Sequence, residues 1–267
     1  MRHKGGGRMM FDHDGVKIYY RWDGEGPPLT LVHGVGGGND AWDSVVEDLK
    51  RDFRILRLDL RGHGQSDKVK GAYKVWDFVS DVKALLDHVG LKRTRLAGFS
   101  LGGLIVQGFA LKHQEYIERL AIMAAVADRT PEEFARVRER LAHLTAKGPL
   151  GHFEASVDRW FTPEFRAKNP DVIARRRLHA ARMDPECYAA AYAVLAETDF
   201  ADRLHEIKVP TLVATGEFDV GSNVRMSTVM HKAIAGSKLH IWPGLKHSML
   251  FEAPHEVSAT LGAFMRG

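Results

Sequence analysis

Short apolar runs alternate with longer amphipathic stretches along most of this 267-residue chain. The apolar runs are bounded by Gly, Pro and Asp, which is typical of parallel strands buried on both faces. They predict strands over residues 16–22, 29–32, 55–58, 95–98, 120–124, 211–215 and 239–242. The amphipathic stretches predict helices over residues 40–49, 75–89, 101–113 and 255–265. This alternation predicts an α/β fold, with a mostly parallel sheet covered by helices on both faces.

The alternation stops between residues 127 and 204, where strand-like runs give way to charged, alanine-rich helical sequence. This stretch is too long to be one loop. Five prolines divide it into four or five short helices: Pro131, Pro149, Pro163, Pro170 and Pro185. We therefore predict a helical cap over residues 127–204, inserted into an α/β core of residues 9–126 and 205–267. Residues 1–8 are basic and glycine-rich, and we expect them to be disordered or to derive from cloning.

Composition places the chain among globular proteins. Hydrophobic residues make up 45% and charged residues 27%, which fits one domain with a sizeable core. The net charge of +4 is mostly scattered, which suggests anionic small molecules rather than nucleic acid as partners. The single cysteine, Cys187, excludes an internal disulfide, and no stretch approaches the ~18 apolar residues of a membrane-spanning helix. We expect a cytoplasmic protein without a membrane partner, and the sequence leaves open a homo-oligomer.

Ser100 is the candidate nucleophile. It lies in the sequence G-F-S-L-G at residues 98–102, where a predicted strand passes into a predicted helix, the context of the G-x-S-x-G nucleophile elbow. Side chains at positions 98 and 102 would collide with the neighbouring strand and helix, so glycine permits the strained turn. The N-terminus of the following helix favours negative charge near the serine. An ordinary glycine-rich turn is the alternative for this motif taken alone.

A serine hydroxyl needs a general base, and that base needs an orienting carboxylate. Nucleophile elbows of this kind occur in the chain order Ser, acid, His. Asp219 and His247 fit this order, and each follows a late predicted strand. Both would therefore lie on the rim of the sheet that carries Ser100. Glu217 and Asp128 are competing acids, with Asp128 as the fallback.

The sequence H-G-V-G-G at residues 33–37 follows another predicted strand. Glycines there let backbone N–H groups turn toward an oxyanion, and we predict a two-donor oxyanion hole from the N–H groups of Val35 and Leu101. A phosphate-binding loop is the alternative, but the P-loop lysine and the G-x-G-x-x-G spacing are absent.

The sequence D-L-R-G-H-G-Q-S at residues 59–66 predicts a structural turn. We expect Asp59 and Arg61 to pair and to hold this turn beside the oxyanion segment. No spacing of His, Cys and Asp predicts a metal site.

Together these motifs resemble those of the α/β-hydrolase superfamily of serine hydrolases. They are, in order, H-G-V-G-G at 33–37, D-L-R-G-H-G-Q-S at 59–66, G-F-S-L-G-G at 98–103, G-E-F-D at 216–219 and P-G-L-K-H-S at 243–248. The resemblance spans residues 11–265. It implies an eight-stranded sheet, a helical cap after the sixth strand, no cofactor, and a triad of Ser100, Asp219 and His247.

Three further segments resemble 3-oxoadipate enol-lactonases and their esterase relatives: residues 54–64, 159–165 and 207–213. The chain departs from these lactonases at Leu101, where they usually have methionine, and at His33, where many have serine. The resemblance implies hydrolysis of a small carboxylic ester or lactone through an acyl-enzyme. Alternatives are carbon–carbon bond hydrolysis of the meta-cleavage-product type, peracid formation, or a ligand-binding receptor with a vestigial triad.

Substrate contacts are expected from the cap and the oxyanion segment, at Gly34, Trp160 and Arg159. Five arginines crowd the predicted cap: Arg159, Arg175, Arg176, Arg177 and Arg182. An arginine that faces inward could hold a substrate carboxylate in a bidentate manner, whereas most of the five should lie on solvated helix faces. Arg159 is the best candidate because it adjoins Trp160 and Phe161, whose apolar bulk should turn inward. Phe161 and Tyr188 either pack the cap or contact substrate.

Overall fold

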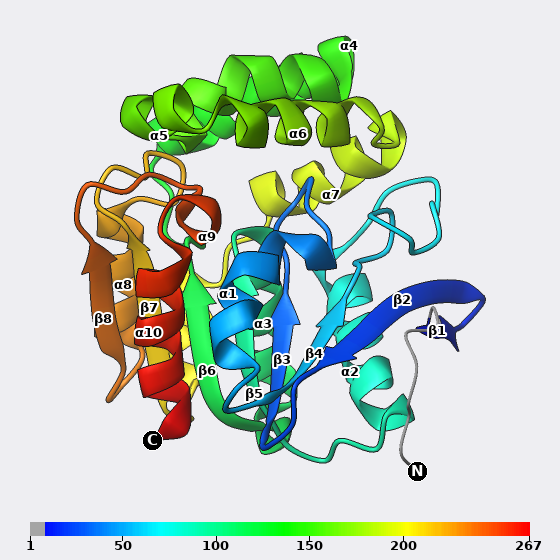
Figure 1. Cartoon of the computed structure of the whole chain (residues 1–267), viewed down its shortest axis with the longest axis vertical. Coiled ribbons are helices and arrows are strands. Elements are labelled where there is room, and N and C mark those ends of the chain that lie inside the picture. The colour runs from blue at the N-terminus through cyan, green and yellow to red at the C-terminus, as the bar shows by residue number, and fades with distance from the viewer. Residues whose placement is uncertain (1–8) are drawn as a thin grey trace.

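The computed structural model describes residues 9–267, which form an eight-stranded sheet between two layers of helices (Figure 1). The strands are β1 (Met9–His13), β2 (Val16–Asp23), β3 (Pro28–Val32), β4 (Arg54–Leu58), β5 (Thr94–Phe99), β6 (Ile117–Met123), β7 (Thr211–Gly216) and β8 (Lys238–Trp242). Their order across the sheet is β1-β2-β4-β3-β5-β6-β7-β8. β2 runs antiparallel to both of its neighbours, and all other pairs are parallel. The predicted fold class is confirmed. The predicted disordered or cloning-derived segment, residues 1–8, lies outside the described residues.

Each face of the sheet has its own hydrophobic core. The helices on one face are α2 (Val75–His88), α3 (Leu101–Lys112) and α8 (Val224–Ala233), and those on the other are α1 (Asp43–Leu49), α9 (Met249–Glu252) and α10 (Pro254–Arg266). Short 3₁₀ helices η1 (Asn39–Trp42), η2 (Gln114–Tyr116) and η3 (Ala201–Glu206) lie in the connections. Every residue of β7 is buried, because helices cover it on both sides. Close packing on both faces therefore fixes the positions of the loops at the carboxyl ends of the parallel strands.

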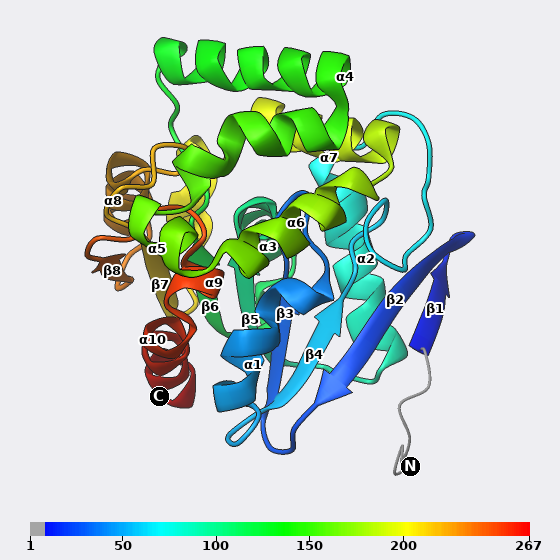
Figure 2. The ribbon, with the colours of Figure 1, turned by 45° about the horizontal axis from the view of Figure 1, so that its top comes forward.

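Four helices after β6 lie over these carboxyl ends and form the cap (Figures 1 and 2). They are α4 (Pro131–Trp160), α5 (Pro163–Lys168), α6 (Pro170–Ala181) and α7 (Pro185–Glu197). Gly148, with a φ of 70°, interrupts α4, and Pro149 begins its second arm. Each of the five cap prolines thus begins a helical segment, because proline in a first turn removes no intrahelical hydrogen bond. The predicted cap after the sixth strand is confirmed.

The cap has a small core of its own. Val137 and Leu144 of α4 pack against Tyr188 and Tyr192 of α7. Within residues 9–267, no helix is both long enough and apolar enough to cross a membrane.

Candidate active site

Ser100 lies at the sharp turn between β5 and α3. Its backbone has a φ of 57° and a ψ of −117°, a strained conformation for a residue with a side chain. A Cβ built on Gly98 would lie 2.1 Å from the carbonyl oxygen of Gly102, and one built on Gly102 would lie 2.2 Å from the carbonyl oxygen of Val32. Glycine is therefore required at both positions, as the sequence motif predicts.

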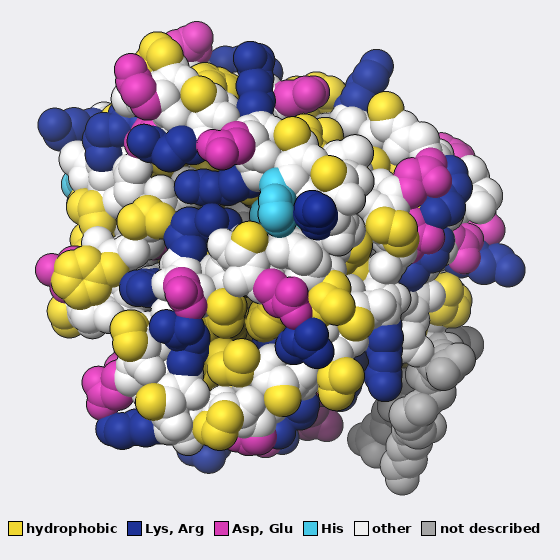
Figure 3. All heavy atoms as spheres, turned by 90° about the horizontal axis from the view of Figure 1, so that it is seen from above, with side chains coloured by type: hydrophobic (Ala, Val, Ile, Leu, Met, Phe, Trp, Pro, Cys, Tyr) yellow, Lys and Arg dark blue, Asp and Glu magenta, His cyan; other side chains and the backbone are white. Residues whose placement is uncertain are grey.

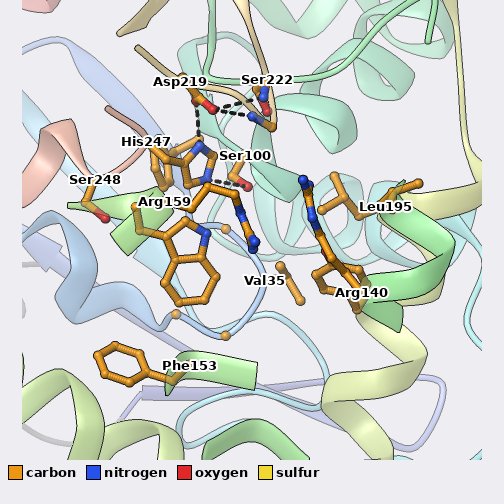
Figure 4. Close-up of a pocket in the computed structure, with 18 of the residues that line it drawn as sticks. Val35, Ser100, Arg140, Phe153, Arg159, Leu195, Asp219, Ser222, His247 and Ser248 are labelled. Atoms are coloured by element: carbon orange, nitrogen blue, oxygen red, sulfur yellow. Dashed lines mark hydrogen bonds and ion pairs between the residues drawn. The ribbon is translucent and has the colours of Figure 1, made fainter. Parts of the chain in front are cut away.

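The structure brings Ser100, His247 and Asp219 together from the loops after β5, β8 and β7 (Figure 4). Ser100 Oγ lies 3.2 Å from His247 Nε2, and His247 Nδ1 lies 2.6 Å from Asp219 Oδ2. Ser100 and Asp219 are only 5% and 3% exposed. The arrangement can move a proton from the serine hydroxyl to the imidazole while the carboxylate holds the other ring nitrogen.

Asp219 is held as a carboxylate by its neighbours. Burial alone would raise its pKa, but the charge and hydrogen bond of His247, together with the N–H groups of Gly221 and Ser222, lower the pKa below its ordinary value. Those N–H groups lie 2.9 and 3.0 Å from Oδ1. Asp219 is therefore ionised and fixed in orientation.

The two competing acids have other partners. Asp128 Oδ2 accepts a hydrogen bond from Arg225 at 3.1 Å, and Glu217 Oε2 accepts one from the backbone N–H of Gly244 at 2.8 Å. Neither carboxylate contacts His247 within hydrogen-bonding distance.

The segment that follows β3 lies directly beside Ser100. A Cβ built on Gly34 would lie 2.9 Å from Ser100 Cβ, so a larger residue would push the segment away. Among residues 9–267, the backbone N–H groups of Val35 and Leu101 have no hydrogen-bond acceptor. They are two free donors on adjacent loops at the predicted oxyanion site.

Two neutral histidines hold this segment against the next loop. His33 Nδ1 lies 2.7 Å from the Gly34 carbonyl, and its Nε2 accepts the N–H of Leu60 at 3.0 Å. His63 Nε2 accepts the N–H of Gly36 at 3.2 Å. Burial lowers the pKa of both rings, that of His63 to about 3, which keeps them available as acceptors near neutral pH.

The 59–66 segment is a structural turn, but the predicted pairing of Asp59 with Arg61 is wrong. Asp59 accepts the backbone N–H groups of Asn39 at 2.6 Å and Gln65 at 2.8 Å, so backbone donors occupy its carboxylate. Arg61 instead forms a bidentate pair with the buried Asp81 of α2, with both contacts at 2.7 Å.

A cavity of about 130 Å³ opens in front of Ser100, between the sheet rim and the cap. Gly34, Trp160 and Arg159, the predicted substrate contacts, all line it. Phe161 and Tyr188 line it too, although both are almost fully buried. The wall thus combines apolar rings with a guanidinium group, which suits a small polar acyl compound.

The cap arginines divide between surface and cavity. Arg175 pairs with Asp171, and Arg177 pairs with Glu154, in each case on exposed side chains. Arg176 lines the cavity with Arg159, whereas its sequence neighbours Arg175 and Arg177 do not. Seen from the cap side, Lys and Arg side chains gather across the middle of this face (Figure 3).

Arg140 also lines the cavity and was not predicted from the sequence. The sequence contained a signal for Arg140. It lies three residues after Val137 and four before Leu144, which places it on the apolar face of α4. A charged residue on the buried face of an amphipathic helix is a candidate for a functional contact.

No group of three or more His, Cys, Asp or Glu side chains within residues 9–267 could hold a metal ion.

Residues 27–254 match the family model described as alpha/beta hydrolase fold, and the chain therefore belongs to that family. It is 30% identical to (E)-2-((N-methylformamido)methylene)succinate hydrolase of Acinetobacter baylyi, over 92% of this chain and 93% of that protein. It is 26% identical to 3-oxoadipate enol-lactonase 2 of the same organism, over 90% of this chain and 89% of that protein.

Among solved structures, the enol-lactonase from Burkholderia xenovorans LB400 matches with a TM-score of 0.90 at 28% identity. The match covers 97% of this chain and 100% of that one. The predicted similarity to enol-lactonases, within an enzymatic α/β-hydrolase family, is confirmed.

Proposed function

We propose that the protein is a serine hydrolase that cleaves a small carboxylic ester or lactone through an acyl-enzyme on Ser100. The observation that carries this proposal is the hydrogen-bond chain from Asp219 through His247 to Ser100, at the floor of a cavity that can hold a small molecule. Two of the similar proteins are named as an enol-lactonase and a succinate-derivative hydrolase, which supports a small acyl substrate.

In the proposed reaction, Ser100 Oγ attacks the acyl carbon while His247 Nε2 takes the hydroxyl proton. The bond to the leaving oxygen then breaks, and His247 returns the proton to that oxygen. Water deprotonated by His247 attacks the acyl-enzyme, which releases the carboxylic acid and restores the Ser100 hydroxyl. Asp219 orients the imidazole and stabilises its protonated form throughout.

The N–H groups of Val35 and Leu101 would bind the oxyanion in each tetrahedral intermediate. Neither donor has an acceptor in the described part of the chain, and both lie on loops adjacent to Ser100. Preorganised donors of this kind each stabilise the transition state by roughly 3–4 kcal/mol. No metal or cofactor takes part in the proposed steps.

The test is Ser100→Ala, which removes the attacking oxygen. Turnover of p-nitrophenyl acetate should fall on the order of 10⁶-fold, and a fluorophosphonate probe should label only the wild-type protein. Circular dichroism checks that the variant remains folded. Ester turnover retained by folded Ser100→Ala would overturn the mechanism.

A substrate panel separates the alternative functions. We expect turnover of short p-nitrophenyl esters, simple lactones or an enol-lactone. Turnover of a meta-cleavage product alone would favour carbon–carbon bond hydrolysis. Probe labelling without turnover of any compound would favour a ligand-binding receptor.

A further inference from the structure

The cavity in front of Ser100 carries an excess of positive charge. Its lining within residues 9–267 includes five arginines and two acidic residues. The arginines are Arg129, Arg136, Arg140, Arg159 and Arg176. Both acidic residues already have partners, because Glu133 Oε2 lies 2.5 Å from Arg225 Nη2 and Asp219 binds His247.

Two of the five guanidinium groups are held by other parts of the protein, and Arg136 is exposed. Arg129 donates hydrogen bonds to the backbone carbonyls of Leu195 at 2.7 Å and Ala196 at 3.4 Å. The guanidinium carbon of Arg176 lies 4.8 Å from the ring centre of Phe251, which indicates a cation–π contact.

Arg140 and Arg159 come from the two arms of α4, and both side chains point into the space in front of Ser100 (Figure 4). Arg159 Nη2 donates to Ser156 Oγ at 2.6 Å, which fixes one side of its guanidinium group. A Cβ built on Gly221 would lie 4.0 Å from Arg140 Nη1, so that group lies beside the loop after β7. Within residues 9–267, no Asp or Glu oxygen lies within 4.0 Å of either guanidinium group.

The positive charges of Arg140 and Arg159 carry a free-energy penalty when no anion lies between them. Burial lowers the pKa of Arg159, and the charge of Arg140 lowers it further. A partly buried charge without a counter-ion loses hydration, and no attractive ion pair compensates for that loss. An anion between the two groups would offset both the lost hydration and their mutual repulsion. A carboxylate fits best, because its two oxygens match the paired N–H donors of a guanidinium group.

We propose that Arg140 and Arg159 form a binding subsite for a carboxylate of the substrate. The subsite assigns the substrate to esters or lactones that carry a second, free carboxylate. This assignment rests on the proposed function for the reaction at Ser100, but the subsite can bind a carboxylate whether or not the reaction occurs.

A second cavity, of about 280 Å³, shares both of these arginines with the cavity in front of Ser100. Among the described residues, its lining comes only from α4, from both arms of the helix. The two guanidinium groups therefore lie between the reaction site and a second opening in the cap. Their positive charge at this position favours the approach of an anion.

The experiment compares two esters of similar length, the mono-p-nitrophenyl ester of glutaric acid and p-nitrophenyl pentanoate. The wild type should have a kcat/KM about 10- to 100-fold higher for the anionic ester, the range expected for hydrogen bonds to a charged group. Arg140→Gln and Arg159→Gln should each lose most of this preference, chiefly through KM for the anionic ester, with a clearly smaller loss of kcat/KM for the neutral ester.

Arg138→Gln is the matched control, because Arg138 lies on α4, is exposed and lines neither cavity. It should behave as the wild type on both esters. Losses of equal size on both esters in Arg140→Gln and Arg159→Gln would overturn the subsite, as would a wild type that turns over the neutral ester equally well.

Calorimetric titration of glutarate into Ser100→Ala tests the subsite without turnover. Binding should weaken about 10-fold or more when Arg140→Gln or Arg159→Gln is added to Ser100→Ala. If no ester is turned over but this loss of binding is seen, the proposed function fails and the subsite stands. If esters are turned over but glutarate binds equally to all variants, the subsite fails and the proposed function stands.

Discussion

At Asp219, burial and hydrogen bonding act in opposite directions on one carboxylate. The side chain is almost fully buried, yet its pKa is lowered, because His247 and two backbone N–H groups all stabilise the ionised form. The same contacts leave the carboxylate one orientation, toward His247 Nδ1. The role that we propose for Asp219 depends on both features, since an amide of equal shape would supply neither the charge nor the same tautomer of the histidine.

Asp219→Asn should therefore lower kcat for p-nitrophenyl acetate by about 10⁴-fold, with little change in KM. Asp128→Asn is the matched control at the alternative position, and it should leave kcat within a few-fold of the wild type because Asp128 pairs with Arg225. Initial rates of both variants at saturating substrate decide the question. The opposite result would assign the acid to the segment after β6.

At the scale of the element, the sequence pattern predicted those strands and helices whose formation depends mainly on local sequence. The buried strands are continuous apolar runs, and the cap helices begin at prolines, so both could be recognised without tertiary information. β1 was missed because it is a five-residue edge strand with alternating exposure, paired with β2 alone. α8 was missed because its β-branched and Ser or Thr residues have low helix propensity, and packing through Met226 and Met230 stabilises it.

The candidate site, likewise, could be predicted only in part from the sequence. Ser100, Asp219 and His247 could be predicted because each follows a strand in an order that the sequence displays. The partner of Arg61 and the cavity that Arg140 lines could not be, since they depend on which elements face each guanidinium group in three dimensions. Tertiary packing, rather than local pattern, brought Asp81 to Arg61 and the cavity to Arg140.

The second arm of α4 contains a buried histidine that makes stability depend on pH. The ring of His152 packs among Trp160, Tyr188 and Tyr192. Its Nε2 has no hydrogen-bond partner within residues 9–267, and burial lowers the pKa of the ring to about 3. Below pH ~6.5 the unfolded chain binds a proton at this residue while the folded chain does not, so the free energy of unfolding falls as the pH falls toward 3.

His152→Phe keeps an aromatic ring and removes this titration. The difference in the free energy of unfolding between pH 7.5 and pH 5.5 should shrink by about 1 kcal/mol relative to the wild type. Urea unfolding at the two pH values measures this difference. An unchanged difference would mean that His152 takes up a proton in the folded state.

At the scale of the whole molecule, hydrogen bonds connect the cap to the core at the loop that carries His247. The Ser248 N–H donates to the Trp160 carbonyl at 2.9 Å, and Lys246 Nζ donates to the Asp158 carbonyl at 2.6 Å. The end of α4, which carries Arg159, and the loop after β8 are thus one connected unit. These bonds fix the proposed substrate contacts of the cap relative to the proposed base of the core.

Glu252 at the end of α9 adds further hydrogen bonds between the core and the cap, and its substitution should weaken the contact between them. Its carboxylate accepts the N–H of Thr162 at 3.1 Å and the Thr162 hydroxyl at 2.5 Å. Glu252→Ala leaves both partly buried donors without an acceptor, which should lower the free energy of unfolding by about 1–3 kcal/mol in urea titrations.

Limited proteolysis should then cut Glu252→Ala between α4 and α6 sooner than it cuts the wild type, because the weakened segment opens locally. Glu256→Ala is the matched control, since Glu256 lies on α10 nearby but is exposed and makes no side-chain hydrogen bond with residues 9–267. That variant should match the wild type in urea and toward protease. Equal destabilisation by both substitutions would show that the bond between Glu252 and Thr162 does not hold the cap to the core.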